Sequence, residues 1–145
     1  MVTTSHQRGT PFSLVVSGEA ESWLPALERI VGPKFLVTYQ VRNDHQLLEV
    51  VHAGLADAAV LDESAPWTVD VIHLLRMIRR MNERLPVVVV TSRSDRHLLE
   101  DALRLAAFSV VTRPLALEEL LRQIQRMMLR LDQMLREQQG PGTRE

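Results

Sequence analysis

Short apolar runs rich in valine alternate along this sequence with longer segments in which apolar residues recur at helical spacing. Several of the short runs are apolar throughout, which is typical of parallel strands that are covered on both faces. The sequence therefore predicts strands linked by helices. The five short runs lie at residues 12–16, 35–41, 58–61, 87–90 and 109–112.

The longer segments carry helix-boundary signals as well as apolar stripes. Asn43 and Gln46 have the spacing of a capping box, and Ser94 or Asp95 is placed to cap a later helix. The resulting order, βαβαβαβαβα, predicts an α/β fold with a doubly wound, five-stranded parallel sheet and helices on both faces. The expected helical stripes lie at residues 23–30, 47–51, 71–81 and 98–106, followed by a last helix from Pro114 to about Gln138.

Composition excludes several classes of protein. The chain has 145 residues, of which 46% are hydrophobic and 24% charged, and this fits one globular domain. The net charge of -1 gives no general attraction to nucleic acid or to an anionic membrane. Because cysteine is absent, disulfides, thiolate metal sites and a cysteine nucleophile are excluded. No apolar run approaches a membrane span, and no signal peptide is visible, so we expect a cytoplasmic domain.

Polar residues stand at the ends of the predicted strands, where open parallel sheets carry their sites. Asp62 follows the third run, Thr91 follows the fourth, and Arg113 follows the fifth. A carboxylate, a hydroxyl and a cation are therefore expected to meet at one edge of the sheet. This trio suits a phosphoryl group, with the carboxylate as its acceptor and the other two groups binding its oxygens.

Motifs of common enzyme classes are missing from the sequence. It has no Gly-x-Gly-x-x-Gly, no phosphate-binding loop that ends in Gly-Lys-Ser/Thr, and no Gly-x-Ser-x-Gly. The five histidines are scattered without the spacing of metal ligands. We therefore expect a protein that is not an enzyme, and a small-molecule site at the strand ends is the least favoured interpretation.

Three stretches of the sequence resemble the response-regulator receiver domain. Asp-Ala-Ala-Val-Leu-Asp-Glu-Ser-Ala-Pro at residues 57–66 is similar to the third strand of that family and its following proline. Residues 85–92 are similar to its fourth strand, and residues 112–115 to its Lys-Pro-aromatic corner. The resemblance implies a flavodoxin-like receiver fold. It also implies that Asp62 accepts phosphate from a histidine kinase and that Thr91 and Arg113 bind the phosphoryl oxygens.

The magnesium site of the family is altered in this chain. The first strand of a receiver ends in a pair of acids that bind the cation, whereas this chain has Ser17 and Gly18, with Glu19 one position later. Asp62 and Glu19 are then the available carboxylates for a hard dication. We expect magnesium to bind weakly or not at all.

Two further departures from the family pattern lie at the lysine of the corner and at the aromatic residue that takes part in the switch of a receiver. Arginine at position 113 stands in the place of the lysine, and Val110 stands in the place of the switch aromatic. We predict that Arg113 pairs with the Asp62 carboxylate in the unmodified protein. Trp67, in the loop after Asp62, is expected either to be an exposed contact residue or to fold back over the sheet.

Two functions follow from this pattern. In the first, the chain is a response-regulator receiver domain of a phosphorelay that acts through protein contacts, with Asp62 as phosphoacceptor. In the second, it is a pseudo-receiver, an interaction or dimerisation module that works without phosphorylation. The missing acid pair favours the second function, whereas Asp62 and Thr91 favour the first. A permanent pair between Arg113 and Asp62 would hold the site in one state without phosphate.

The last helix carries an apolar stripe that is longer than the sheet of a receiver needs. A projecting apolar stripe requires a partner, so we predict a homodimer through this helix. The alternatives are a helix that folds onto its own domain, or a partner helix from another protein. The predicted interface residues are Leu117, Ile124, Leu131, Met134 and Leu135. The predicted division is a mobile tail at 1–11, the receiver-like domain at 12–128, and a helical extension with a tail at 129–145.

Overall fold

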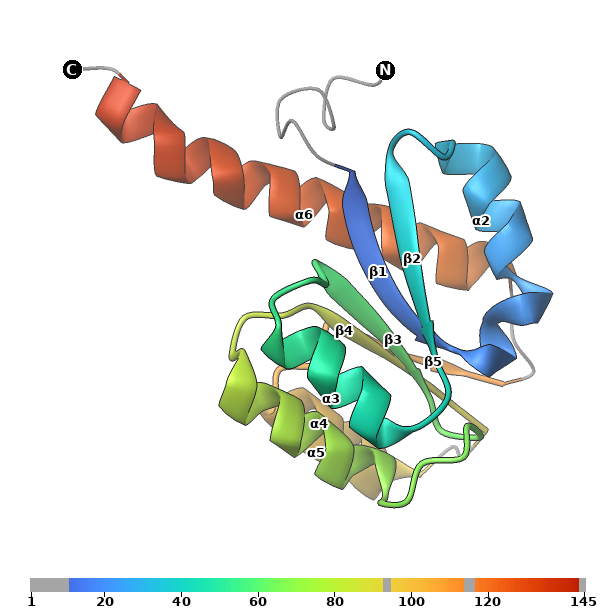
Figure 1. Cartoon of the computed structure of the whole chain (residues 1–145). Coiled ribbons are helices and arrows are strands. Elements are labelled where there is room, and N and C mark those ends of the chain that lie inside the picture. The colour runs from blue at the N-terminus through green and yellow to red at the C-terminus, as the bar shows by residue number, and fades with distance from the viewer. Residues whose placement is uncertain (1–10, 93–94, 114–116, 144–145) are drawn as a thin grey trace.

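The computed structural model describes residues 11–92, 95–113 and 117–143, including their side chains except at 18, 19 and 135–143. Five strands form one parallel sheet in the order β2-β1-β3-β4-β5 (Figure 1). The prediction of a flavodoxin-like, doubly wound sheet is confirmed. The strands are β1 (Phe12–Ser17), β2 (Leu36–Val41), β3 (Ala58–Asp62), β4 (Val87–Thr91) and β5 (Ser109–Thr112).

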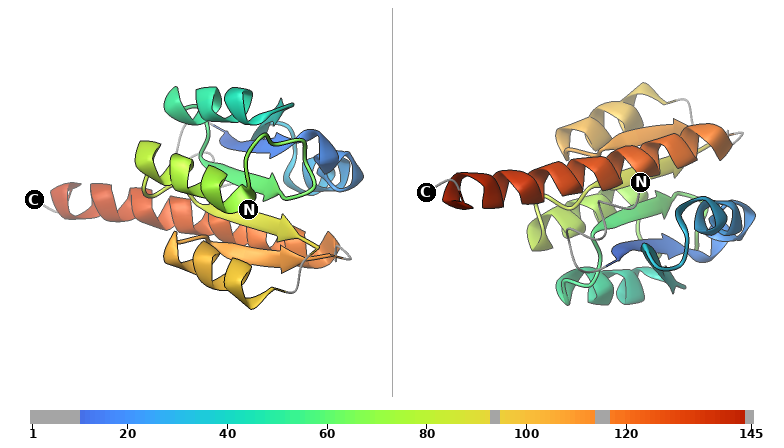
Figure 2. Two further views of the ribbon diagram at one scale, coloured as in Figure 1. Left: turned by 90° about the horizontal axis from the view of Figure 1, so that it is seen from below. Right: turned by 90° about the horizontal axis from the view of Figure 1, so that it is seen from above.

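Helices cover both faces of the sheet (Figure 2). One face carries α2 (Leu24–Val31) and the long α6 (Leu117–Thr143), and the other face carries the remaining α-helices. A short 3-10 helix, η1 (Gly18–Ser22), precedes α2 and was not predicted. The opposite face carries α3 (Asp44–His52), α4 (Val71–Met81) and α5 (Arg96–Arg104).

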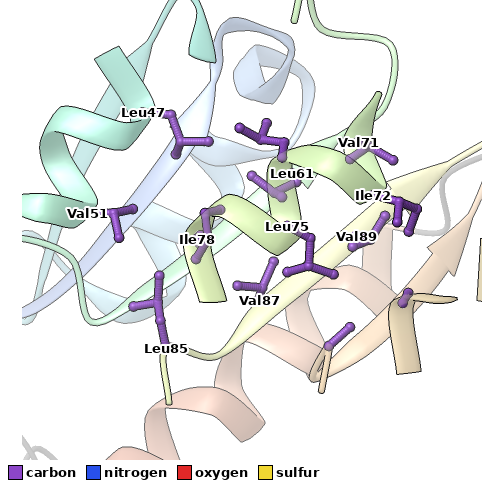
Figure 3. Close-up of a cluster of buried hydrophobic side chains, with 14 of the residues drawn as sticks. Leu47, Val51, Leu61, Val71, Ile72, Leu75, Ile78, Leu85, Val87 and Val89 are labelled. Carbon is purple, nitrogen blue, oxygen red and sulfur yellow. The ribbon is translucent and has the colours of Figure 1, made fainter. Parts of the chain in front are cut away.

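The central strands are apolar throughout because both of their faces are covered. Every residue of β3 and β4 is buried. Leu61 and Val89 point into the cluster beneath α3, α4 and α5, which Figure 3 shows, whereas Val60 and Val90 pack beneath α2 and α6. Burying each such side chain contributes roughly 1.5–3 kcal/mol to the stability of the fold. This burial holds β3 and β4 in the centre of the sheet, and their carboxyl ends form the edge that carries the site.

Helix caps agree with the boundary signals. The side chain of Asn43 accepts a hydrogen bond from the backbone N–H of Gln46 at 2.9 Å. In turn, Oε1 of Gln46 accepts one from the N–H of Arg42 at 2.7 Å. The cap of α5 is Asp95, whose carboxylate accepts from the N–H of His97 at 2.9 Å. The capping prediction is thus confirmed at the start of α3 and at Asp95.

The last helix continues past the amino-terminal edge of the sheet (Figure 1). It has 27 residues, about 40 Å at 1.5 Å per residue, and it ends at Thr143, so the predicted end near Gln138 was too early. Ile124 is completely buried against the sheet. It was predicted as an interface residue but is a core residue, because the first half of α6 covers its own domain. Among the described residues, no helix combines the length and apolar character that a membrane span requires.

Candidate functional site

Three strand ends bring the predicted site residues together at the carboxyl edge of the sheet. Asp62 is the last residue of β3 and is 4% exposed, and Thr91 is the last residue of β4 and is 1% exposed. Arg113 directly follows β5. The register pairs Asp62 with Val90 and Thr91 with Thr112, and the N–H of Arg113 donates to the carbonyl oxygen of Thr91 at 2.7 Å. Parallel pairing alone therefore places carboxylate, hydroxyl and guanidinium beside one another.

Both carboxylate oxygens of Asp62 are engaged by groups of the chain itself. Oδ1 accepts hydrogen bonds from the backbone N–H of Ser64 at 3.0 Å and from its hydroxyl at 2.8 Å. Oδ2 accepts from Nη2 of Arg113, with which it forms an ion pair. The predicted contact between Arg113 and Asp62 is confirmed. Because the carboxylate is nearly buried, solvent and salt screen this charge-assisted hydrogen bond only weakly.

The hydroxyl of Thr91 has a partner that the sequence did not suggest. It hydrogen-bonds to Oε1 of Glu63, the residue that follows Asp62. Glu63 is held at the sheet edge by its own N–H, which donates to the carbonyl oxygen of Val90 at 2.8 Å. A hydroxyl has one proton to donate. To donate to a phosphoryl oxygen at Asp62, Thr91 must therefore exchange its present partner.

The loop between β3 and α4 folds back over the sheet. The indole N–H of Trp67 donates to the carbonyl oxygen of Asp62 at 2.8 Å, and the backbone N–H of Ala65 donates to the same oxygen at 3.0 Å. The half-buried Trp67 side chain packs against the core cluster beneath α3, α4 and α5. Of the two interpretations of Trp67, the one in which it folds back is therefore correct.

The same loop is also fastened to the start of α3. The hydroxyl of Thr68 donates to Oδ2 of Asp44 at 2.5 Å. This hydrogen bond is the largest influence on Asp44 and lowers the pKa of its carboxyl, while burial acts more weakly in the opposite direction. The loop that follows Asp62 is thus tied to both the sheet and a neighbouring helix.

A polar cavity of about 370 Å³ opens beside the ion pair. Carboxylates, hydroxyls and one guanidinium line it, so it is suited to a small polar group and not to an apolar ligand. Its lining residues are Glu63, Ser64, Asp70, Ser92 and Arg113.

The described residues fit magnesium poorly. The buried Ser17 offers a hydroxyl where the cation needs a carboxylate, and a guanidinium already occupies Oδ2 of Asp62. Across the described part of the chain, no group of three or more histidine, cysteine, aspartate or glutamate residues could hold a metal ion. The side chain of Glu19, the second predicted carboxylate, lies outside the described residues. Weak or absent magnesium binding stays a prediction.

The predicted interface residues on α6 have unequal environments. Leu117 is 37% exposed, Leu131 and Met134 are half-buried, and the side chain of Leu135 lies outside the described residues. Leu129 is 59% exposed and was not in the predicted set. Among the described side chains of α6, the most exposed large apolar residue therefore lies outside the predicted set.

Sequence reasoning missed two residues that contact the site. Ser64 binds Asp62, and the aspartate followed two residues later by serine is typical of a turn in which a carboxylate caps the backbone. Glu63 binds Thr91, and its position directly after Asp62 was the available signal. Both signals predict that the residue lies near the site, but neither indicates which rotamer its side chain adopts.

The comparisons with known proteins agree with the fold. The sequence profile of the response regulator receiver domain matches residues 20–125. No curated protein sequence matches the chain. A putative response regulator from Chloroflexus aurantiacus J-10-fl is 17% identical with a TM-score of 0.66, and the match covers 82% of this chain and 98% of that one. A CheY-like receiver domain protein from Methanospirillum hungatei JF-1 is 13% identical with a TM-score of 0.71, over 86% and 98% of the two chains.

A third similar structure bears on the metal. The receiver domain of a sensor histidine kinase from Pseudomonas aeruginosa PAO1 is 20% identical with a TM-score of 0.65, over 81% of this chain and 98% of that one. That protein has a magnesium ion coordinated in its active-site cleft. The structural likenesses establish the fold, and the profile covers most of the sequence. This chain therefore belongs to the response-regulator receiver domain family of two-component signalling.

Proposed function

We propose that this receiver domain signals through protein contacts without phosphorylation, with its acceptor site held by the ion pair between Asp62 and Arg113. The observation that supports the proposal is the complete engagement of the Asp62 carboxylate by Ser64 and Arg113. The guanidinium supplies the positive charge that a magnesium ion would otherwise bring to this oxygen. The site thereby has a stable state that needs neither metal nor phosphate.

A phosphate-operated switch is the second candidate. It is favoured by the burial of Asp62 at a strand end, by the neighbouring Thr91 and by the polar cavity beside them. In this case an oxygen of Asp62 attacks the phosphorus of a phosphohistidine and a P–O bond forms. The P–N bond breaks, and the imidazole nitrogen keeps the electron pair and takes up a proton. Arg113 and Thr91 then bind the phosphoryl oxygens.

Intact mass after incubation with acetyl phosphate and magnesium tests the proposal. We expect no phosphoryl gain for the unaltered chain, because the acid pair is missing and Arg113 occupies the carboxylate. A control variant that combines Ser17→Asp, Gly18→Asp and Arg113→Lys restores the family's residues and is expected to gain one phosphoryl group. A gain in the unaltered chain that Asp62→Asn abolishes would establish the switch instead and refute the first proposal.

The partners proposed for this domain are a histidine kinase or another signalling protein, and a second copy of the chain. The second copy is supported by an apolar groove of about 340 Å³ between α6 and α2, which the exposed side chain of Leu129 lines.

A further inference from the structure

A second hollow lies at the opposite edge of the sheet from Asp62. It has a volume of about 800 Å³ and lies where β4 and β5 begin, between the end of α4, the turn before β5 and one face of α6. This is the end of the sheet at which α6 projects (Figure 2). A cavity of this size falls within the range that binds small molecules, which is about 300–1,000 Å³.

The charged lining of this hollow is strongly positive. Arg79, Arg84, Arg126 and Arg130 line it, against the single carboxylate of Glu83. In the described part of the chain, Arg84, Arg126 and Arg130 form no ion pair. Among the described side chains, four arginines and one carboxylate therefore line the hollow, although the protein as a whole has a net charge of -1.

The side chain of Arg79 holds the backbone around the hollow in place. Its Nε donates to the carbonyl oxygen of Leu105 at 2.6 Å, its Nη1 to that of Asn82 at 3.1 Å, and its Nη2 to that of Ala106 at 3.0 Å. One side chain thus closes the carboxyl ends of both α4 and α5. The turn includes Ala106 at a φ of 59°, a left-handed conformation that is uncommon for a residue other than glycine. The rim is therefore held in place before any ligand arrives.

The lining of the hollow is also partly apolar. Leu85, Phe108 and Met134 add apolar surface to it.

From this arrangement we propose that the hollow is a binding site for a small phosphate-bearing anion, with Arg84, Arg126 and Arg130 as its charged ligands. The planar guanidinium fork binds phosphate oxygens in pairs. The apolar lining accommodates the organic part of a phosphate ester. This site is independent of Asp62, so it gives the receiver a second input that does not pass through the acceptor carboxylate.

Calorimetric titration of the full chain with inorganic pyrophosphate and with ADP tests the site and distinguishes an inorganic from an organic source. Citrate serves as a carboxylate anion of comparable charge. We expect at least one of the two phosphate probes to bind, and Arg126→Ala with Arg130→Ala to weaken that binding by about tenfold or more. The matched control combines Arg76→Ala with Arg80→Ala, two exposed arginines of α4 outside the hollow, and is expected to leave it unchanged.

The proposal is overturned if neither phosphate probe binds at millimolar concentration, if citrate binds as tightly, or if the Arg76 and Arg80 control loses as much affinity as the Arg126 and Arg130 variant.

Discussion

At the scale of single residues, the acceptor site is governed by what a nearly buried carboxylate requires. Asp62 obtains donors for both oxygens from Ser64 and Arg113. A lysine in the place of Arg113 would present a compact ammonium, whereas arginine presents a planar fork that matches a carboxylate. The substitution seen in this sequence therefore changes the resting state of the site as well as the geometry of any phosphoryl contact.

Replacing Arg113 with alanine is expected to lower the free energy of unfolding by about 1–3 kcal/mol, because the Asp62 carboxylate stays buried without its cation. The effect is smaller than for a fully buried pair because the side chain of Arg113 is 32% exposed. Urea denaturation followed by tryptophan fluorescence measures the difference. Asp62→Asn combined with Arg113→Ala is expected to recover part of the loss. Strictly additive effects of the two changes would contradict the coupling.

A second residue-scale prediction concerns pH. The hydrogen bond from Thr68 lowers the pKa of Asp44 in the folded state. The bond therefore stabilises the folded protein fully at pH values above the pKa of the unfolded chain, about 3.9. This stabilisation is lost as the pH falls through the pKa of the folded state. Thr68→Val is expected to raise the Asp44 pKa towards its ordinary value and to make the acid-side loss of stability shallower. Carboxyl titration by NMR measures the shift, with Thr68→Ser as the control that keeps the hydroxyl. An unchanged pKa in the valine variant would exclude this hydrogen bond as the cause.

At the scale of elements, the strands could be predicted well because burial on both faces leaves a clear sequence pattern. The predicted run at 87–90 and the observed β4 differ by one residue, Thr91. Helix faces were harder, since helical spacing does not show where the sheet beneath a helix ends. Ile30 and Leu103 belong to predicted apolar stripes, yet they are 57% and 56% exposed.

In the site too, some contacts could be predicted from the sequence pattern and others could not. Strand ends and parallel pairing brought Asp62, Thr91 and Arg113 together as predicted. Opposite charge at adjoining strand ends made the pair between Arg113 and Asp62 predictable. The bond between Thr91 and Glu63 depends on rotamers at the start of a loop, and no periodic pattern encodes them.

Two substitutions on α6 are expected to have very different costs. Ile124→Ala removes a completely buried side chain beneath the sheet and is expected to lower the free energy of unfolding by about 2–5 kcal/mol. Leu129→Ala changes a side chain that is 59% exposed and is expected to stay within about 0.5 kcal/mol of the unaltered protein. Urea denaturation of both variants measures the contrast. Equal costs would show that the second half of the helix packs on its own domain.

At the scale of the whole molecule, the fold places the site at Asp62, the arginine-lined hollow and the projecting helix in different regions of the surface. Asp62 lies at the carboxyl edge of the sheet, and the arginine-lined hollow lies at the opposite edge. Between them, α6 passes along the face that it shares with α2 and projects beyond the sheet (Figure 1). A partner that binds the projecting helix therefore contacts the molecule away from Asp62, and this arrangement suits a domain whose contacts do not depend on phosphorylation.

The exposed apolar surface of α6 and α2 is expected to join two copies of the chain. Leu129 and Ile30 are 59% and 57% exposed and line the same groove. In a two-fold dimer each copy contributes both side chains. Covering the remaining half of each contributes roughly 1 kcal/mol or more, which association entropy partly offsets. We therefore expect a weak dimer that forms only at high protein concentration.

Sedimentation equilibrium of the unaltered chain, of Leu129→Asp and of Leu103→Asp tests this dimer. Leu103 is a matched control because it is 56% exposed but lies on α5, on the other face of the sheet. Leu129→Asp is expected to give monomers because it places a charge in the apolar contact, whereas Leu103→Asp is expected to leave the association constant unchanged. If Leu103→Asp alone dissociates the dimer, the contact lies on α5. If the unaltered chain stays monomeric at hundreds of micromolar, the proposed dimer through this groove is refuted.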